Sequence, residues 1–290
     1  MSIFSLDGTQ IDAAYDLDGE PLDSAYDYTG GVVWSDSLKV MTYNVGGWYT
    51  GSGSNVPAAK KDQYYALQTG MIEDADPDIL FINEYLAQFS ADGTSALTML
   101  QSLFPYVEAK TSGTYFGRAI CSKYPITNYT QHSFTTGTTT YYYDSANVTI
   151  NGKGITLVVL HLMVNPEADR YLQAQELLAY LLTLDSFIAA GDYNTGISPD
   201  YGTDNTESTP YQHYIKLFTD EGFHVANGGD FGFFVTCNDG VDGAGTDWDI
   251  DNIITSSDIT ITSAHVDTTK LTDGLQDKTD HMPLIATVTF

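Results

Sequence analysis

The segment TDHMPLIATV (residues 279–288) places two residues with acid–base and metal-binding chemistry directly before an apolar run. Asp280 and His281 are adjacent, and the run from Leu284 onward is typical of a buried strand. An Asp at the start of a strand is often part of a turn or a cap. A carboxylate beside an imidazole is also a combination that transfers protons. The residues at the ends of the other apolar runs distinguish a capped turn from a catalytic pair.

Several other apolar runs present a single polar residue where they end. The runs KVMTYN, DILFINE, TLVVLH, FIAAGDYN and DIDNII carry Asn44, Glu84, His161, Asp192 with Asn194, and Asp251. Each of these residues alone is more often a turn former, a solvated loop residue or a hydrogen-bonded core histidine. Burying carboxylates is unfavourable unless they are paired or bind a metal ion. Because α/β sheets build sites at strand ends, the joint pattern predicts that these side chains gather at one edge.

From residue 38 onward, strand-like runs alternate with helix-like segments. We expect strands at 38–45, 78–84, 117–126, 186–192, 249–257, 259–266 and 283–290, and a hairpin over 147–162 that turns at Asn151-Gly152. Helices are expected at 58–74, at 95–104, from Asn165-Pro166 onward, and at 211–219. Helices and hairpins between strand pairs predict an α/β fold, a mixed sheet sandwich covered by helices.

Residues 1–36 differ from the rest of the chain. LDGTQIDAAYD (6–16) is followed by LDGEPLDSAYD (17–27), an imperfect repeat of 11 residues in a segment without Lys or Arg. Two repeats are too few for a solenoid core. We therefore expect an acidic N-terminal appendage that mediates attachment or oligomerisation. No linker divides 37–290, which is expected to form one domain.

The overall charge limits the kind of partner. The chain has 38 acidic and 11 basic residues and a formal net charge of −27, which repels polyanions at long range. Bound divalent cations would reverse that field locally. No apolar run is long enough for a transmembrane segment, no signal peptide is visible, and the composition is typical of extracellular or virion proteins. Cys121 and Cys237 have no zinc-site spacing, and Cys121 is expected to be a buried free thiol.

An ordered set of motifs between residues 38 and 290 resembles a known family. MTYNV, DILFINE, GRAICSKYPI, VVLHL, AAGDYNTG, DIDNII and TDHMPL are similar to the endonuclease/exonuclease/phosphatase superfamily, which includes deoxyribonuclease I, abasic-site endonucleases, neutral sphingomyelinases and inositol-polyphosphate 5-phosphatases. The resemblance implies a four-layer α/β/β/α sandwich of two mixed sheets flanked by helices. It also implies a catalytic domain at 37–290 that uses Mg²⁺ or Mn²⁺ to hydrolyse phosphoesters.

The resemblance also implies residue roles. Glu84 is expected to be the principal metal ligand, helped by Asn44 and Asp280, because hard divalent cations take oxygen ligands. 

On the water side of the phosphate, His281 is expected to act as general base or transition-state contact, held by Asp251. Asp192 is expected to orient the attacking water, and Asn194 and His161 to bind phosphate oxygens. A histidine at the position of His161 favours the deoxyribonuclease I and sphingomyelinase branches of the family over the abasic-site endonucleases.

Two questions stay open at this level. Arg118 stands where the family commonly has Asn, and it either contacts phosphate or forms a structural ion pair. The favoured function is a nuclease-like phosphodiester hydrolase acting on DNA or RNA. The alternatives are a phosphatase or sphingomyelinase-like phospholipase acting on a small phosphorylated headgroup, and a non-enzymatic surface-binding module. The segments 45–55 and 134–144 are either substrate-facing or flexible surface loops.

Overall fold

The structure is a computed structural model that describes residues 3–4, 10–11, 24–26, 32–35, 37–49, 61–86, 90–91, 94–110, 117–135, 140–164, 166–195, 216–229, 231–238, 247–268 and 281–290. Its centre consists of two six-stranded sheets. The first sheet has the order β19 (Thr260–Val266), β20 (Leu284–Thr289), β5 (Ser37–Asn44), β6 (Ile79–Tyr85), β10 (Gly117–Ser122) and β9 (Tyr106–Lys110). The second has the order β11 (Thr127–Ser133), β12 (Tyr142–Ile150), β13 (Lys153–His161), β14 (Phe187–Asp192), β18 (Asp251–Thr255) and β15 (His224–Val225).

Both sheets are mixed. The neighbours β5 and β6 run parallel in the first sheet, as β13 and β14 do in the second, and the remaining pairs within these two sheets are antiparallel. The connection of each parallel pair contains a helix, at Lys61–Ala75 and at Glu167–Leu181, in agreement with the general rule that parallel strands need a crossover. The predicted strand runs therefore correspond to real strands.

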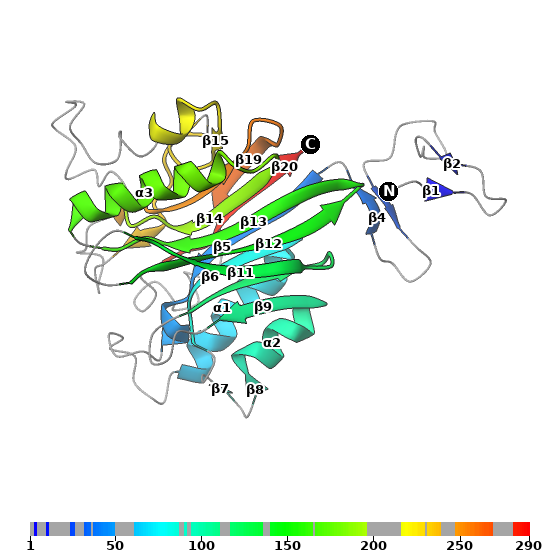
Figure 1. The fold of residues 1–290 in the computed structure, drawn as a ribbon. Helices are drawn as coiled ribbons and strands as arrows, with labels where there is room; N and C mark the ends of the chain where they lie inside the picture. The colour runs from blue at the N-terminus through cyan, green and yellow to red at the C-terminus, as the bar shows by residue number, and fades with distance from the viewer. Residues whose placement is uncertain are drawn as a thin grey trace.

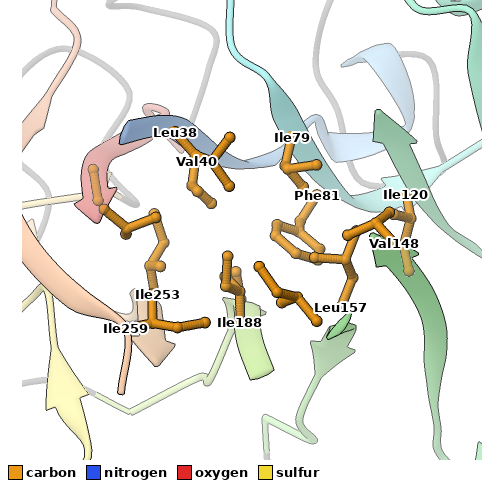
Figure 2. Packing of buried hydrophobic residues seen from close by; sticks show 14 of the residues in the cluster. Leu38, Val40, Ile79, Phe81, Ile120, Val148, Leu157, Ile188, Ile253 and Ile259 are labelled. Atoms are coloured by element: carbon orange, nitrogen blue, oxygen red, sulfur yellow. The ribbon is translucent and has the colours of Figure 1, made fainter. Parts of the chain in front are cut away.

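The two sheets pack through alternate residues of their strands. Leu38, Val40, Ile79, Phe81 and Ile120 of the first sheet face a layer from the second sheet that includes Val148, Leu157, Ile188 and Ile253 (Figure 2). Successive side chains of a strand point to opposite faces, so every second residue enters this inter-sheet core. The complementary residues of each strand face outward, toward the helices.

Helices cover the two outer faces of the sandwich. On the first sheet, α1 (Lys61–Ala75) and α2 (Ala96–Leu103) pack against buried residues such as Met41, Leu80 and Ile82 (Figure 1). On the second sheet, α3 (Glu167–Leu181) packs Leu177 and Leu181 against a cluster built from β13 and β14. The predicted four-layer α/β/β/α sandwich is confirmed.

Turn and cap residues set several element boundaries. Asn151 and Gly152 have φ of 51° and 82°, the left-handed values that a tight hairpin turn between β12 and β13 requires. Ser95 caps α2, with its hydroxyl accepting from the Thr98 N–H at 3.1 Å. Pro166 is the N-cap of α3, one position before its first helical residue Glu167, so the helix begins where the sequence predicts it.

Other expectations are corrected or fall outside the described residues. The hairpin is longer than predicted, because β12 starts at Tyr142 and so takes in the end of the segment 134–144. Residues 216–219 are helical, in the second half of the predicted helix 211–219. Cys121 and Cys237 are both buried and neither forms a disulfide, which confirms the expected buried thiol of Cys121. Among the described residues no helix is long and apolar enough to cross a membrane.

Short strand pairs occupy the described parts of the remaining chain. In the N-terminal segment, β1 (Ile3–Phe4) pairs with β2 (Gln10–Ile11), and β3 (Ser24–Tyr26) pairs with β4 (Val32–Ser35). Most of the 11-residue repeat lies outside the described residues, so the appendage and its role stay predictions. The other short elements are η1 (Gly46–Tyr49), β7 (Ser90–Ala91), β8 (Thr94–Ser95), β16 (Cys237–Asn238) and β17 (Asp247–Trp248).

Candidate active site

Polar residues border the inter-sheet core at one edge of the sandwich, which we call the site edge. Each of them lies two positions along its strand from an apolar core residue, which places it in the same inter-sheet layer. The pairs of polar and apolar residues are Asn83 with Phe81, Arg118 with Ile120, Asp144 with Ala146, His161 with Val159, Asp192 with Ala190, and Asp251 with Ile253. Strand direction decides whether the polar residue comes first or last, since β10, β12 and β18 run opposite to β6, β13 and β14.

His281 and Asp251 form a buried pair that joins the two sheets. His281 Nδ1 lies 2.7 Å from Asp251 Oδ2, and both side chains are more than nine-tenths buried. Burial opposes protonation of the imidazole, but the Asp251 carboxylate and Cys237 outweigh it, and the pKa of His281 lies well above its ordinary value. The arrangement holds a protonated imidazole with its Nε2 facing the site.

Asp192 uses its two carboxylate oxygens differently. Oδ1 accepts the backbone N–H of Asn194 at 2.7 Å, which is the turn interaction that an Asp commonly makes. Oδ2 lies 3.4 Å from His161 Nε2 and 3.7 Å from His281 Nε2. Burial and the nearby Asp251 raise the pKa of Asp192 to about 7. His281 and the hydrogen bonds from Asn194 and Asn44 lower this pKa and so offset part of the rise. A carboxylate with a pKa near neutrality is suited to accept a proton.

Asn44 connects the two carboxylates of the site edge. Its amide nitrogen donates to Glu84 Oε1 and to Asp192 Oδ2, each at 3.1 Å. Its amide oxygen accepts the backbone N–H of Gly46 at 3.0 Å. Asn44 is buried, so these bonds fix the relative positions of one carboxylate from each sheet.

Glu84 lies on a β-bulge. Gly117 pairs with Tyr85 and Arg118 pairs with Asn83, so Glu84 is the extra residue between them. Its φ is 55°, a left-handed conformation that costs a non-glycine residue about 1–2 kcal/mol. Bulges re-aim side chains and are frequent next to active sites. Here the bulge gives a partly exposed carboxylate to a strand whose neighbouring positions are buried.

Asn83, which we did not single out from the sequence, ties three strands together behind the site. Its amide nitrogen donates to the Leu160 carbonyl at 2.5 Å, and its oxygen accepts the Asp192 N–H at 3.0 Å. The close approach requires Gly191, where an added Cβ would lie 1.9 Å from the Leu160 oxygen. The signal available in the sequence was its position two residues after Phe81 in the same strand.

His161 and Asn194 lie where β13 and β14 end. Burial lowers the pKa of His161, and the nearby positive groups add to that effect while Glu84 opposes it. Asn194 has a left-handed φ of 50° and donates its amide nitrogen to the Leu162 carbonyl at 2.8 Å. It therefore serves as a turn former, whatever further contact its side chain makes with a ligand.

Arg118 forms the ion pair that was one of its two expected roles. Arg118 Nε lies 2.8 Å from Asp144 Oδ2, and the two side chains are 9% and 0% exposed. The pair joins β10 of the first sheet to β12 of the second. Asp144 was not identified from the sequence, although it lies two residues before Ala146 in the alternating pattern.

A loop that sequence reasoning missed supports the His281–Asp251 pair. The Thr236 hydroxyl accepts the Asp251 N–H at 3.0 Å, and the Thr236 carbonyl accepts the Met282 N–H at 2.7 Å. Cys237 forms a backbone bridge with His281. Asn227 holds this loop through its side-chain bonds to Phe234 and to the Asp251 carbonyl. Nothing in the sequence marks these contacts.

The residues present fit a divalent cation better at Glu84 than at the histidine. Asp192, Asp251 and His281 offer one ligand atom each within 4.8 Å of one another. In the structure Asp251 Oδ2 and His281 Nδ1 are already joined by a hydrogen bond, which engages both of these atoms. The bulged Glu84 is a partly exposed oxygen donor, which suits Mg²⁺ or Mn²⁺. Asp280 lies outside the described residues, directly before His281.

Comparisons with known proteins agree with this architecture. The model of the Endonuclease/Exonuclease/phosphatase family matches residues 41–281. A family protein from Bacteroides thetaiotaomicron is 16% identical, with a TM-score of 0.64 over 88% of this chain and 95% of that chain. Truncated TDP2 from Caenorhabditis elegans is 15% identical, with a TM-score of 0.63 over 88% and 98% of the two chains.

D. rerio TDP2, solved with a single-strand DNA product, is 16% identical, with a TM-score of 0.62 over 88% of this chain and 100% of that chain. No curated protein sequence matches this chain. At these identities the solved structures show a shared fold. The family model adds the sequence match, which runs from β5 to His281. The protein therefore belongs to the endonuclease/exonuclease/phosphatase family, whose members are hydrolases that act on phosphoester bonds.

Proposed function

We propose that the protein is a divalent-metal-dependent phosphodiester hydrolase of the nuclease type, in which water attacks phosphorus. The observation that carries the proposal is the bridging position of Asn44 between Glu84 and Asp192, at 3.1 Å from each carboxylate. In this proposal one carboxylate binds the metal ion and the other contacts the attacking water. The fold shared with a TDP2 solved with a single-strand DNA product supports a nucleic-acid substrate.

The metal side of the site consists of Glu84, with Asp280 as the second ligand by its motif. A bound Mg²⁺ or Mn²⁺ supplies positive charge to the nonbridging phosphate oxygens. Asn44 presents its amide nitrogen to Glu84, so its contribution is to orient that carboxylate rather than to bind the ion directly. The oxygen donors and the net charge of −27 both favour binding of a hard cation.

The water side consists of Asp192, His281 and Asp251. With a pKa raised to about 7, Asp192 accepts the proton of the water whose oxygen forms the new bond to phosphorus. His281 is held protonated by Asp251, so it acts as a hydrogen-bond donor to a phosphate oxygen rather than as the base. The P–O bond to the leaving group then breaks, and the departing oxygen takes a proton from solvent and leaves as the alcohol. His161 and Asn194 are assigned to phosphate oxygens at the ends of β13 and β14.

The test is hydrolysis of plasmid DNA and of bis-p-nitrophenyl phosphate with Mg²⁺, with Mn²⁺ and with a chelator. Wild-type protein is expected to need the metal, and His281→Ala to reduce turnover by about a hundredfold or more. Glu108→Gln, an exposed carboxylate on β9 of the first sheet, is the matched control and should keep full activity. Cleavage of the small diester alone would indicate a lipid or a small phosphorylated headgroup as the substrate instead of a nucleic acid. Absence of metal-dependent turnover on both substrates by folded protein would refute the proposal.

A further inference from the structure

The site edge is arranged as successive cross-sheet pairs on neighbouring strands. In the first sheet β5, β6 and β10 are neighbours, and in the second sheet β14, β13 and β12 are neighbours. The first cross-sheet pair is Asn44 of β5 with Asp192 of β14, and the second is Glu84 of β6 with His161 of β13. The third is Arg118 of β10 with Asp144 of β12. Strands are spaced by about 4.8 Å, so the third pair lies one spacing beyond Glu84 and about two beyond Asn44.

The third pair brings a guanidinium, Arg118, to an edge that otherwise carries carboxylates, amides and histidines, although its partner Asp144 makes the pair neutral overall. Arg118 pairs in register with Asn83, directly beside the bulge that presents Glu84. It is also one of the groups whose positive charge lowers the pKa of His161, after the larger effect of burial. The chain has only 11 Lys and Arg residues, and one of them is buried at this position.

The guanidinium of Arg118 has donors left over. Its Nε donates to Asp144 Oδ2 at 2.8 Å, and Asp144 is the one residue in the described part of the chain that hydrogen-bonds the Arg118 side chain. Guanidinium groups carry five N–H donors in a planar fork that matches phosphate oxygens. Asp144 fixes the plane of that fork from the Nε side and leaves both Nη groups available.

A structural role alone accounts poorly for the pair. A buried ion pair is often no more stabilising than apolar residues of similar volume, because desolvation offsets the attraction. Arg118 and Asp144 directly continue the apolar positions Ile120 and Ala146, where apolar side chains would extend the core. Binding of a charged ligand by Arg118 would explain why β10 and β12 carry charged side chains at these two positions.

We propose that Arg118, oriented by Asp144, binds a second phosphate of the substrate, adjacent to the one that is hydrolysed. The inference rests on the proposed phosphodiester hydrolysis and specifies its substrate as one with two neighbouring phosphates. Such a ligand is either a polynucleotide or a small molecule with several phosphate groups. Both sources present the same phosphate oxygens to the guanidinium.

The experiment compares substrates that differ only in the second phosphate. The thymidine dinucleotide TpT is compared with its 5′- and 3′-phosphorylated forms, and the small phosphodiester glycerophosphoinositol with glycerophosphoinositol 4-phosphate. Wild-type protein should have a higher kcat/KM on a two-phosphate member, and Arg118→Gln should reduce that preference about tenfold or more, on the scale of a charged hydrogen bond. A preference confined to the dinucleotides identifies a polynucleotide, and one confined to the glycerophosphoinositols identifies a small headgroup. Either result supports the second phosphate site.

Controls separate binding from stability. Lys153→Gln removes a positive charge at the opposite end of β13 from His161 and should leave the preference unchanged. Arg118→Gln leaves Asp144 buried without its partner, so the double variant with Asp144→Asn removes the second charge as well. The double variant should unfold at a higher temperature than the single one but should still lack the preference.

Three results would overturn the inference. The first is an unchanged preference in folded Arg118→Gln, and the second is recovery of the preference in the double variant; both would make the pair purely structural. The third is wild-type cleavage of TpT with no preference for a second phosphate, which leaves the proposed function intact. Wild-type protein that cleaves none of the substrates would remove the proposed function and this inference together.

Discussion

His281 Nδ1 lies 2.7 Å from Asp251 Oδ2, although Asp251 belongs to the second sheet and His281 lies just before the last strand of the first. Asp251 begins β18 of the second sheet, and His281 precedes β20 of the first. The bond therefore exists only when the two sheets are packed in the observed register. The histidine therefore has a carboxylate partner that is distant in the sequence.

Asp251→Asn should lower the pKa of His281, because burial then acts without the opposing carboxylate. We expect turnover of bis-p-nitrophenyl phosphate to fall by about a hundredfold or more, since the imidazole loses both its charge and its orientation. The measurement is an NMR titration of the histidine ring protons beside the kinetic assay. An unchanged His281 titration with lost activity would contradict the role given to Asp251.

The bulge at Glu84 predicts a difference between two substitutions that both remove the carboxylate. Glu84→Gly relieves the left-handed strain, whereas Glu84→Ala keeps it, so the glycine variant should be more stable by about 1 kcal/mol. Both variants should lose metal-dependent turnover. Urea unfolding of the two proteins checks the difference. A more stable alanine variant would mean that the bulge is absent.

Asn44→Ala should impair the site without removing any of its charges. The two carboxylates at 3.1 Å from the amide nitrogen lose their common donor, so they are no longer held in fixed positions. We expect kcat to fall about tenfold to a hundredfold and the metal concentration for half-maximal activity to rise. Metal titrations of wild type and variant decide this. Full activity at an unchanged metal requirement would rule out the bridging role.

Asp258 gives a pH prediction remote from the site. Burial opposes its ionisation, but hydrogen bonds from Lys153, Ser186 and Ser256 lower its pKa to about 2. A carboxylate with a depressed folded pKa stabilises the protein above its unfolded pKa of about 3.9 and loses that effect as the pH falls toward 2. Its side chain is 42% exposed, so we expect about 1 kcal/mol or less.

The check is denaturant unfolding of wild type and Asp258→Asn at pH 7 and at pH values below 4. The stability difference should be constant between pH 7 and 5 and should shrink below pH 4. A difference that grew on acidification would have the wrong sign for this account.

Much of the fold was predictable because alternation and turn chemistry act locally. The strand runs ending at Asn44, Glu84, His161 and Asp192 are readable from the sequence, and so is the hairpin turn at Asn151-Gly152. Which strands become neighbours is not local information. The same alternation placed Arg118 and Asp144 in the inter-sheet layer, but their pairing required knowing that β10 faces β12 across the sandwich.

Backbone conformation explains other misses. The bulge at Glu84 depends on the register between β6 and β10, which no motif encodes. Thr236 and Asn227 act through bonds to backbone groups of the Asp251 and His281 segments, so their side-chain types carry little signal. Asn44 was expected to help bind the metal by its motif; its amide nitrogen donates to Glu84 and Asp192, and its role toward a metal stays a prediction.

The most direct test of the central claim is the Mg²⁺- and Mn²⁺-dependent hydrolysis of bis-p-nitrophenyl phosphate by wild type, Glu84→Gln and Asp192→Asn, with folding verified by circular dichroism. The account predicts metal-dependent turnover in the wild type, a loss of about a hundredfold or more in both variants, and full activity in Glu108→Gln. Metal-dependent turnover that survives in folded Glu84→Gln and Asp192→Asn would show that the chemistry takes place elsewhere than at the site edge.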